Sequence, residues 1–121
     1  MCSSDLGLSP TREDQSEFAV DPSTGAWRQR IDRLLDDPAY GEKWGRHWMD
    51  VWRYSDWDGY KDALRGSQRH IWHWRDWIIE SLNVDKGYDR MIHEMVAGDE
   101  IAPEDLDTLR ATGFQIGRAH V

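Results

Sequence analysis

The chain has 121 residues with a formal net charge of −8, of which 31% are charged and 39% hydrophobic, and its mean hydropathy is −0.82. This acidity argues against nucleic acid or an anionic membrane as a partner, because both need a basic surface. The lack of an apolar run of about 18 residues argues against a membrane span. The eight tryptophans argue against disorder, since a few buried indole rings replace many aliphatic side chains in a core.

Two helices are predicted before residue 38. Thr11 is a hydroxyl cap followed by acidic residues in the first turn, which predicts a helix that continues to about Val20. Asp21-Pro22 disfavours continuation, and Ser23 can cap a second helix that ends near Pro38. The second helix has apolar residues at helical spacing: Trp27, Ile31, Leu34 and Leu35.

The third and fourth predicted helices carry most of the tryptophans. The third helix is predicted from an apolar stripe at i, i+4, i+7 and i+8, which consists of Trp44, Trp48, Val51 and Trp52. This helix is expected to end near Tyr54. The fourth has Ser67 as its cap, Asn83 as its end, and its own stripe: Ile71, Trp74, Ile78 and Leu82. We expect indole rings from these two helices to meet in the core: Trp44, Trp48, Trp74 and Trp77.

Two shorter helices complete the predicted fold. A fifth runs from about Tyr88 to Ala97, with Gly98 as its stop signal, and a sixth runs from Pro103 to Leu109. No segment of strand length alternates apolar with polar residues, so almost no sheet is expected. The predicted fold is therefore all-α, an irregular bundle of about five or six short helices with a tryptophan-rich core.

The two chain ends resemble translated sequencing adapters. Residues 2–6 (CSSDL) match one adapter strand, and residues 116–121 (IGRAHV) match the opposite strand. We therefore expect residues 1–6 and 116–121 to be scars of a metagenomic fragment, leaving 7–115 as one partial, N-terminally truncated helical domain. The single cysteine, Cys2, falls in the first scar, so no disulfide argument applies.

Seven blocks of the chain, in order, resemble a known family pattern. They are residues 6–11 (LGLSPT), 31–35 (IDRLL), 40–51 (YGEKWGRHWMDV), 53–60 (RYSDWDGY), 75–77 (RDW), 97–99 (AGD) and 111–114 (ATGF). Together they are similar to the domain of unknown function that follows the haem module in planctomycete-type cytochrome c proteins. The resemblance implies a larger exported protein, located in the periplasm or secreted, whose other domains would be the partners of this one.

That resemblance implies haem in a separate domain, and no cofactor is expected in this fragment. No Cys-x-x-Cys-His motif occurs in the chain, so covalent haem attachment is not expected here. The family pattern has no settled activity, so the chemistry has to be argued from the residues themselves.

Carboxylates and imidazoles gather around the loop between the third and fourth predicted helices. If these helices pack antiparallel, Asp56 and Asp58 lie near His70 and His73, which suits a divalent cation or acid–base catalysis. These four residues are the metal and catalytic candidates. An Asp-x-Asp-Gly calcium loop is incomplete, because Arg65 stands where its final acidic ligand is needed. The alternative is structural: Arg53 pairs with a carboxylate, and Asp56 and Asp58 bond loop amides.

One tryptophan breaks the helical stripes. Trp57 lies between two aspartates in a turn, and with Arg53 and Tyr60 it is a candidate for ligand binding. Three functions therefore stay open: a structural or ligand-binding module of the larger protein, a metal-assisted hydrolase acting on a polysaccharide, and a carbohydrate-binding module that uses an exposed tryptophan.

Overall fold

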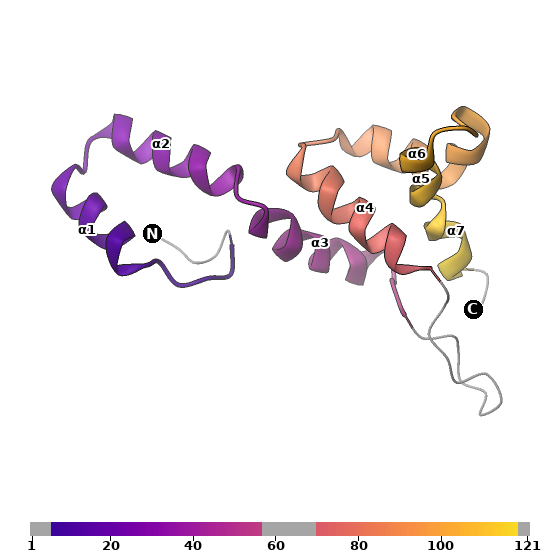
Figure 1. The fold of residues 1–121 in the computed structure, drawn as a ribbon, viewed down its shortest axis with the longest axis horizontal. Helices are drawn as coiled ribbons and strands as arrows, with labels where there is room; N and C mark the ends of the chain where they lie inside the picture. Colours follow the sequence, from indigo (N-terminus) through magenta and orange to yellow (C-terminus); the bar gives the residue numbers. More distant parts are fainter. Residues whose placement is uncertain (1–5, 57–69, 119–121) are drawn as a thin grey trace, which may run out of the picture.

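The computed structural model describes residues 6–56 and 70–118, with backbone only at 116–118. Its helices are α1 (Arg12–Val20), α2 (Thr24–Leu35), α3 (Ala39–Val51), α4 (Trp72–Asn83), α5 (Tyr88–Ile101), α6 (Leu106–Ala111) and α7 (Gly113–Arg118). The described residues contain no strand, which confirms the all-α prediction. Figure 1 shows α1 and α2 at one end of an elongated molecule, α4 to α7 at the other, and α3 between them.

The first two helices begin where local capping chemistry predicts. The Asp14 amide donates to Thr11 Oγ1 at 3.1 Å, and the Thr11 amide donates to Asp14 Oδ2 at 3.0 Å, which makes a reciprocal capping box. At α2 the Ala26 amide donates to Ser23 Oγ at 3.2 Å. Each contact satisfies an amide that has no partner within its own helix.

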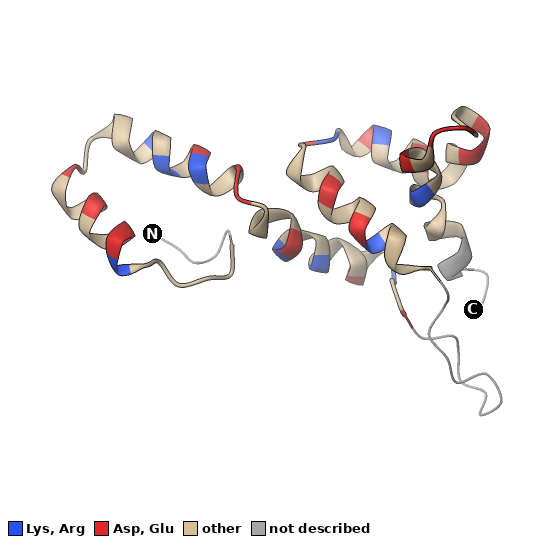
Figure 2. Cartoon of the chain, in the orientation of Figure 1, with Lys and Arg blue, Asp and Glu red and all other residues tan. Residues whose placement is uncertain are grey.

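These two helices form a hairpin without a core. Neither α1 nor α2 contains a buried residue. Phe18 and Trp27 meet with ring centroids 5.5 Å apart, and Arg33 Nη1 lies 3.3 Å from Glu17 Oε2. Figure 2 shows acidic positions along α1 and mainly basic positions along α2. The hairpin is therefore joined by a few half-exposed contacts between oppositely charged helices.

The core lies between α3 and the C-terminal helices, and it is rich in tryptophan as predicted. Its buried hydrophobic residues are Trp52, Ile71, Trp74, Trp77, Ile78, Met91, Met95 and Ala111. Trp48 packs against this cluster from α3. Trp44 was expected in the core, but it is 37% exposed, and Val51 is also exposed.

Two glycines explain why the predicted stripe on α3 is displaced. Gly41 and Gly45 are the buried residues of α3. A Cβ atom on Gly41 would lie 2.5 Å from the Ile79 carbonyl oxygen, and one on Gly45 would lie 3.1 Å from Ile79 Cγ1. The α3 face that meets α4 is thus centred on glycine, which permits close backbone approach but adds no apolar weight to a hydrophobicity pattern. Trp44 instead contacts Tyr40 and His47.

Several predicted helix boundaries differ from the structure. The third predicted helix ends at Val51 and not near Tyr54, the sixth begins at Leu106 and not at Pro103, and α7 was not predicted. Gly98 does not end α5: the chain bends at Ala97 (φ −138°, ψ 22°) and continues helically to Ile101. Gly98 is buried, and a Cβ atom there would lie 2.8 Å from the Thr108 carbonyl oxygen, so its role is to let α6 approach α5. The fourth helix begins at Trp72 with Ile71 in the cap position, and Ser67 lies outside the described residues.

Candidate functional site

The structure describes four of the seven predicted site residues. Arg53, Asp56, His70 and His73 are described, whereas Trp57, Asp58 and Tyr60 lie outside the described residues. Arg53 and His70 both have a positive φ, 57° and 67°, a conformation that residues other than glycine adopt uncommonly. Both flank the segment 57–69, so the backbone turns sharply on each side of it.

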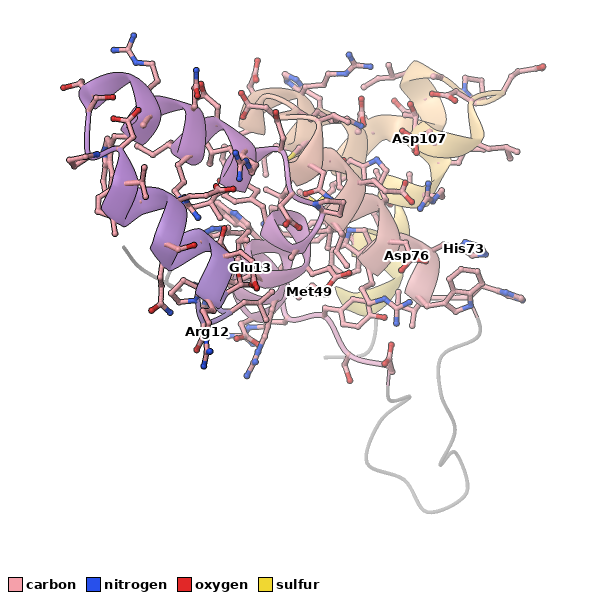
Figure 3. All side chains as sticks on the ribbon, turned by 60° about the vertical axis from the view of Figure 1, so that its left-hand side comes forward. Arg12, Glu13, Met49, His73, Asp76 and Asp107 are labelled. Carbon is pink, nitrogen blue, oxygen red and sulfur yellow. The ribbon has the colours of Figure 1, made fainter. Side chains whose placement is uncertain are left out.

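The two histidines do come together at the start of α4. The His70 and His73 ring centroids are 6.0 Å apart with planes inclined by 21°, and His73 also lies against Trp72 at 3.6 Å between ring centroids. Figure 3 shows His73 and Asp76 near the start of α4. Within the part of the chain that the structure describes, no three residues of the types His, Cys, Asp and Glu are grouped to hold a metal ion. Because Asp58 lies outside that part, the metal site stays a prediction.

Asp56 is engaged by a tyrosine that the sequence patterns did not single out. The Tyr54 hydroxyl donates to Asp56 Oδ1. Burial, together with the adjacent Asp56 carboxylate, raises the pKa of Tyr54 well above its usual range, so this hydroxyl stays protonated and keeps donating. The Tyr54 ring also lies 5.7 Å from the Trp74 ring, which ties this loop to the core.

Asp76 is paired on its own helix. Arg75 Nε donates to Asp76 Oδ1 at 2.9 Å, and Arg75 Nη2 lies 2.8 Å from the same oxygen. This hydrogen bond raises the pKa of Arg75. Asp56 and Asp76 are therefore held by Tyr54 and Arg75, and the structural alternative, in which Arg53 pairs with a carboxylate and loop amides bond the aspartates, stays a prediction.

A pocket of about 410 Å³ lies beside the histidines, between α4, α6 and the start of α7. Among the described residues it is lined by His70, Ile71, His73, Trp74, Leu106, Leu109, Arg110, Thr112 and Gly113. Gly113 is needed where α7 meets α4, because a Cβ atom there would lie 2.5 Å from Trp74 Cβ. No local sequence pattern indicates that α6 lines a pocket, because its residues approach α4 only through the packing of α5 and α6.

Two lining residues carry buried N–H groups without an acceptor among the described residues: Trp74 Nε1 and Arg110 Nε. Arg110 Nη1 is by contrast well paired, 2.6 Å from Glu80 Oε2 and 3.0 Å from Asp107 Oδ1. The bond to Glu80 raises the pKa of Arg110. A buried donor left without an acceptor costs about 1–3 kcal/mol, and both N–H groups are fully buried, so they lie within the packed side chains and not on the pocket surface.

The family follows from one comparison. A model of the PSCyt2 family, described as a protein of unknown function (DUF1549), matches residues 3–120. The chain belongs to the PSCyt2 family. This confirms the resemblance to the domain of unknown function in planctomycete cytochrome c-type proteins. Comparison with curated proteins gives no match, and comparison with solved structures gives none.

This PSCyt2 chain also has a buried charge cluster on α5 that the sequence patterns missed. Glu94 is 4% exposed, and its carboxylate accepts from Lys86 Nζ at 2.8 Å and from Arg90 Nε at 2.7 Å. Burial raises the pKa of Glu94, but the hydrogen bonds from both cations outweigh it and leave that pKa below its usual value. Lys86 Nζ also lies 4.9 Å from the centre of the Trp77 ring. The cluster ties the α4–α5 turn to the core.

The helices of this PSCyt2 domain are short. Within residues 6–56 and 70–118, none combines the length and the apolar composition needed to cross a membrane. The longest, α5, has 14 residues.

Proposed function

We propose that this PSCyt2 domain binds a small molecule in the pocket between α4, α6 and α7. The observation that carries the proposal is the pocket itself, which has a volume of about 410 Å³ and a mostly apolar surface and is lined by His70 and His73 among other residues. Sites for small molecules are concave, mostly apolar, of about 300–1,000 Å³, and contain a few placed polar groups. The pocket has each of these features.

The family supplies the wider setting of the proposal. The PSCyt2 name associates the domain with cytochrome c-type proteins. We extend the proposal to a module of a larger, exported protein that carries haem in a separate domain and works with the other domains of the same polypeptide. In that setting the pocket would present a bound molecule to those domains.

The described residues favour binding over metal-assisted hydrolysis of a polysaccharide. The hydrolase needs carboxylates free to act with His70 and His73. Asp56, the described carboxylate among the predicted candidates, accepts from Tyr54, and Asp76 on α4 accepts from Arg75, so both already have partners. The roles predicted for Asp58, and for Trp57, Arg53 and Tyr60 in sugar binding, stay predictions.

The test fills the pocket with a larger side chain. Leu109 lines the pocket and is half-buried, so Leu109→Trp should occlude it, whereas Val51→Trp places the same side chain on the exposed end of α3. Binding of ethylbenzene to the full chain would be followed by ¹H–¹³C NMR. The methyl signals of Ile71 and Leu109 report on binding in the wild type, and those of Ile71 are compared among all three proteins, because Leu109→Trp removes the Leu109 methyl groups.

The expected result is saturable binding to the wild type and to Val51→Trp, and at least tenfold weaker binding to Leu109→Trp, about the effect of losing one well-packed apolar contact surface. Equal binding of ethylbenzene to all three proteins would contradict the proposal. So would a failure of both ethylbenzene and its ketone analogue acetophenone to bind to the wild type.

A further inference from the structure

We infer that the α1–α2 hairpin binds a second copy of this chain, with the two α2 helices side by side and antiparallel. The inference is independent of the proposed binding function, because the hairpin and the pocket lie at opposite ends of the molecule (Figure 1). It is carried by three properties of α2: an apolar stripe that stays largely exposed, the side of the helix that is already covered, and the order of the charges beside the stripe.

The stripe consists of Trp27, Ile31 and Leu35, which recur every four residues and therefore lie on one face of α2. These residues are between 37% and 48% exposed. Phe18 of α1 extends the apolar surface, because its half-exposed ring meets that of Trp27. No described helix packs closely along α2. The stripe is therefore an apolar helix face that the described part of the chain leaves open.

The next face around the helix is already covered. Arg30 and Leu34 each precede a stripe residue by one position, which places them about 100° around the helix. Arg30 pairs with Asp14 of α1, and both Arg30 and Leu34 line a small hollow with the segment before α1. The hairpin therefore closes one side of the stripe, and a second helix can approach from the other side.

The charges on that open side identify the second helix. Arg28 lies near the N-terminal end of the stripe, and Asp32 and Asp36 follow one turn apart towards its C-terminal end. None of these three side chains is in an ion pair with a described residue. An acidic partner would match the arginine but repel both aspartates, and a basic partner would do the reverse. The partner that fits carries the same charges in reversed order, as a second, antiparallel α2 does.

A two-fold axis at Ile31 gives this match. It reverses the direction of the second helix and places the open side of α2 against the same side of its copy. At a rise of about 1.5 Å per residue, Arg28 of each chain then lies level with the midpoint between Asp32 and Asp36 of the second copy. In a parallel pair each charge would instead lie level with its own copy, which is unfavourable.

The same axis pairs the apolar residues. Trp27 and Leu35 are each four residues from Ile31, so Trp27 of one chain meets Leu35 of the other, and the two Ile31 side chains meet at the axis. The interface is small, because a standard interface has about 20–30 residues a side. We therefore expect a reversible dimer with a dissociation constant on the order of 100 µM.

The test measures the mass of the full chain by analytical ultracentrifugation. The average mass should rise from the monomer value of 14.2 kDa towards twice that value as the concentration increases from about 1 µM to about 1 mM. Ile31→Glu places two like charges at the axis and should weaken the dimer at least about tenfold. Val96→Glu introduces the same residue at an exposed position of α5 and should leave the dissociation constant unchanged.

A charge exchange tests the antiparallel pairing itself. Arg28→Glu and Asp36→Arg should each weaken the dimer about fivefold, because each places like charges together at two symmetric positions. Combined in one chain, the two substitutions put opposite charges together again and should recover most of the affinity. Both residues are exposed, so the exchange leaves the core unchanged, and circular dichroism confirms that each variant keeps its helices.

A chain that stays monomeric at about 1 mM would overturn the inference, and so would a dimer that Ile31→Glu leaves intact. A dimer that Arg28→Glu weakens but that the double variant does not recover would overturn the antiparallel pairing, and assembly beyond a dimer would overturn the two-fold axis. Binding of ethylbenzene to the pocket is a separate measurement, so the failure of either proposal leaves the other standing.

Discussion

The α1–α2 hairpin and the body formed by α3 to α7 differ in what holds their helices together. Neither α1 nor α2 buries a residue, whereas α4 alone buries Trp74, Trp77, Ile78 and Ser81. The N-cap residues of α1, α2 and α6 supply side-chain caps, whereas those of α3 and α4 do not, and the first-turn amides of α3 are bonded instead by Asp37 and Asn83. Local capping chemistry therefore determines where a helix starts, and tertiary packing supplies most of its stability.

The two regions also use charge differently. The carboxylates in the ion pairs between α1 and α2 are half-exposed or exposed, such as Glu17 with Arg33, although Arg30, which pairs with Asp14, is mostly buried. In the body, Glu94 is buried between Lys86 and Arg90. Exposed pairs contribute little because water screens them, whereas removing one member of a buried pair leaves a charge without compensation. The comparison predicts that matched substitutions will have large effects in the body and small ones in the hairpin.

The largest difference is expected for tryptophan. Trp77 is fully buried and Trp27 is 39% exposed. Trp77→Ala should lower the free energy of unfolding by about 3–5 kcal/mol, because it removes a large contact surface and leaves a cavity. Trp27→Ala should lower it by about 1 kcal/mol or less. Urea unfolding followed by circular dichroism measures both, and similar losses for the two variants would show that the hairpin has a core of its own.

The next difference concerns carboxylates. Glu94→Gln should lower the free energy of unfolding by about 2–3 kcal/mol, because the bonds from Lys86 and Arg90 lose their charged acceptor. Glu17→Gln should change it by about 0.5 kcal/mol or less, since the Glu17 side chain is 59% exposed. A Glu94→Gln protein as stable as the wild type would show that the buried cluster contributes no net stability.

The same carboxylate gives the body a pH dependence of stability. Because the pKa of Glu94 in the folded protein lies below its ordinary 4.5, its contribution is complete above pH 4.5 and is lost as the pH falls through the lowered value. The groups around it are Lys86 and Arg90, with Asp107 near Lys86, and both cations stay charged in this range. Urea midpoints at about pH 7 and about pH 3.5 should therefore differ more for the wild type than for Glu94→Gln.

Effects of opposite sign in the two regions, each smaller than that of Trp77→Ala, are expected for glycine. Gly41→Ala should lower the free energy of unfolding by about 1–3 kcal/mol, because the new Cβ atom would lie 2.5 Å from the Ile79 carbonyl oxygen. Gly25 in α2 has only Ser23 Oγ nearby, at 3.8 Å, so Gly25→Ala should stabilise that helix by up to about 1 kcal/mol. Amide hydrogen exchange in α2 measures the second effect, and faster exchange there would contradict it.

The fold could be predicted from the sequence wherever a residue acts on its immediate neighbours. Thr11 and Ser23 cap the helices that they were expected to cap, and Trp74 and Trp77 are buried as their spacing predicts. Prediction failed at Trp44 and Gly98. In both cases a glycine that packs against another helix decided the outcome, and helical spacing alone could not show which helix would approach it.

The candidate site could be predicted only in part. The sequence indicated His70 and His73, and the structure brings their rings together at the edge of a pocket. It did not indicate Leu109 or Arg110, which reach α4 from at least 26 residues beyond its last residue, Asn83. Residues this far apart in the sequence meet only when the helices between them pack, so a local sequence pattern cannot predict the contact.

The sequence by itself determined the helical class, the starts of α1 and α2, the family, and the acidity of the chain, because each depends on residue types or on spacing within a few turns. Only the tertiary structure decided that glycines form the α3 face against α4, that Glu94 is buried between two cations, and that α6 closes a pocket over Trp74. The physical reason is range: capping acts over three or four residues, whereas burial depends on surfaces that distant segments bring together.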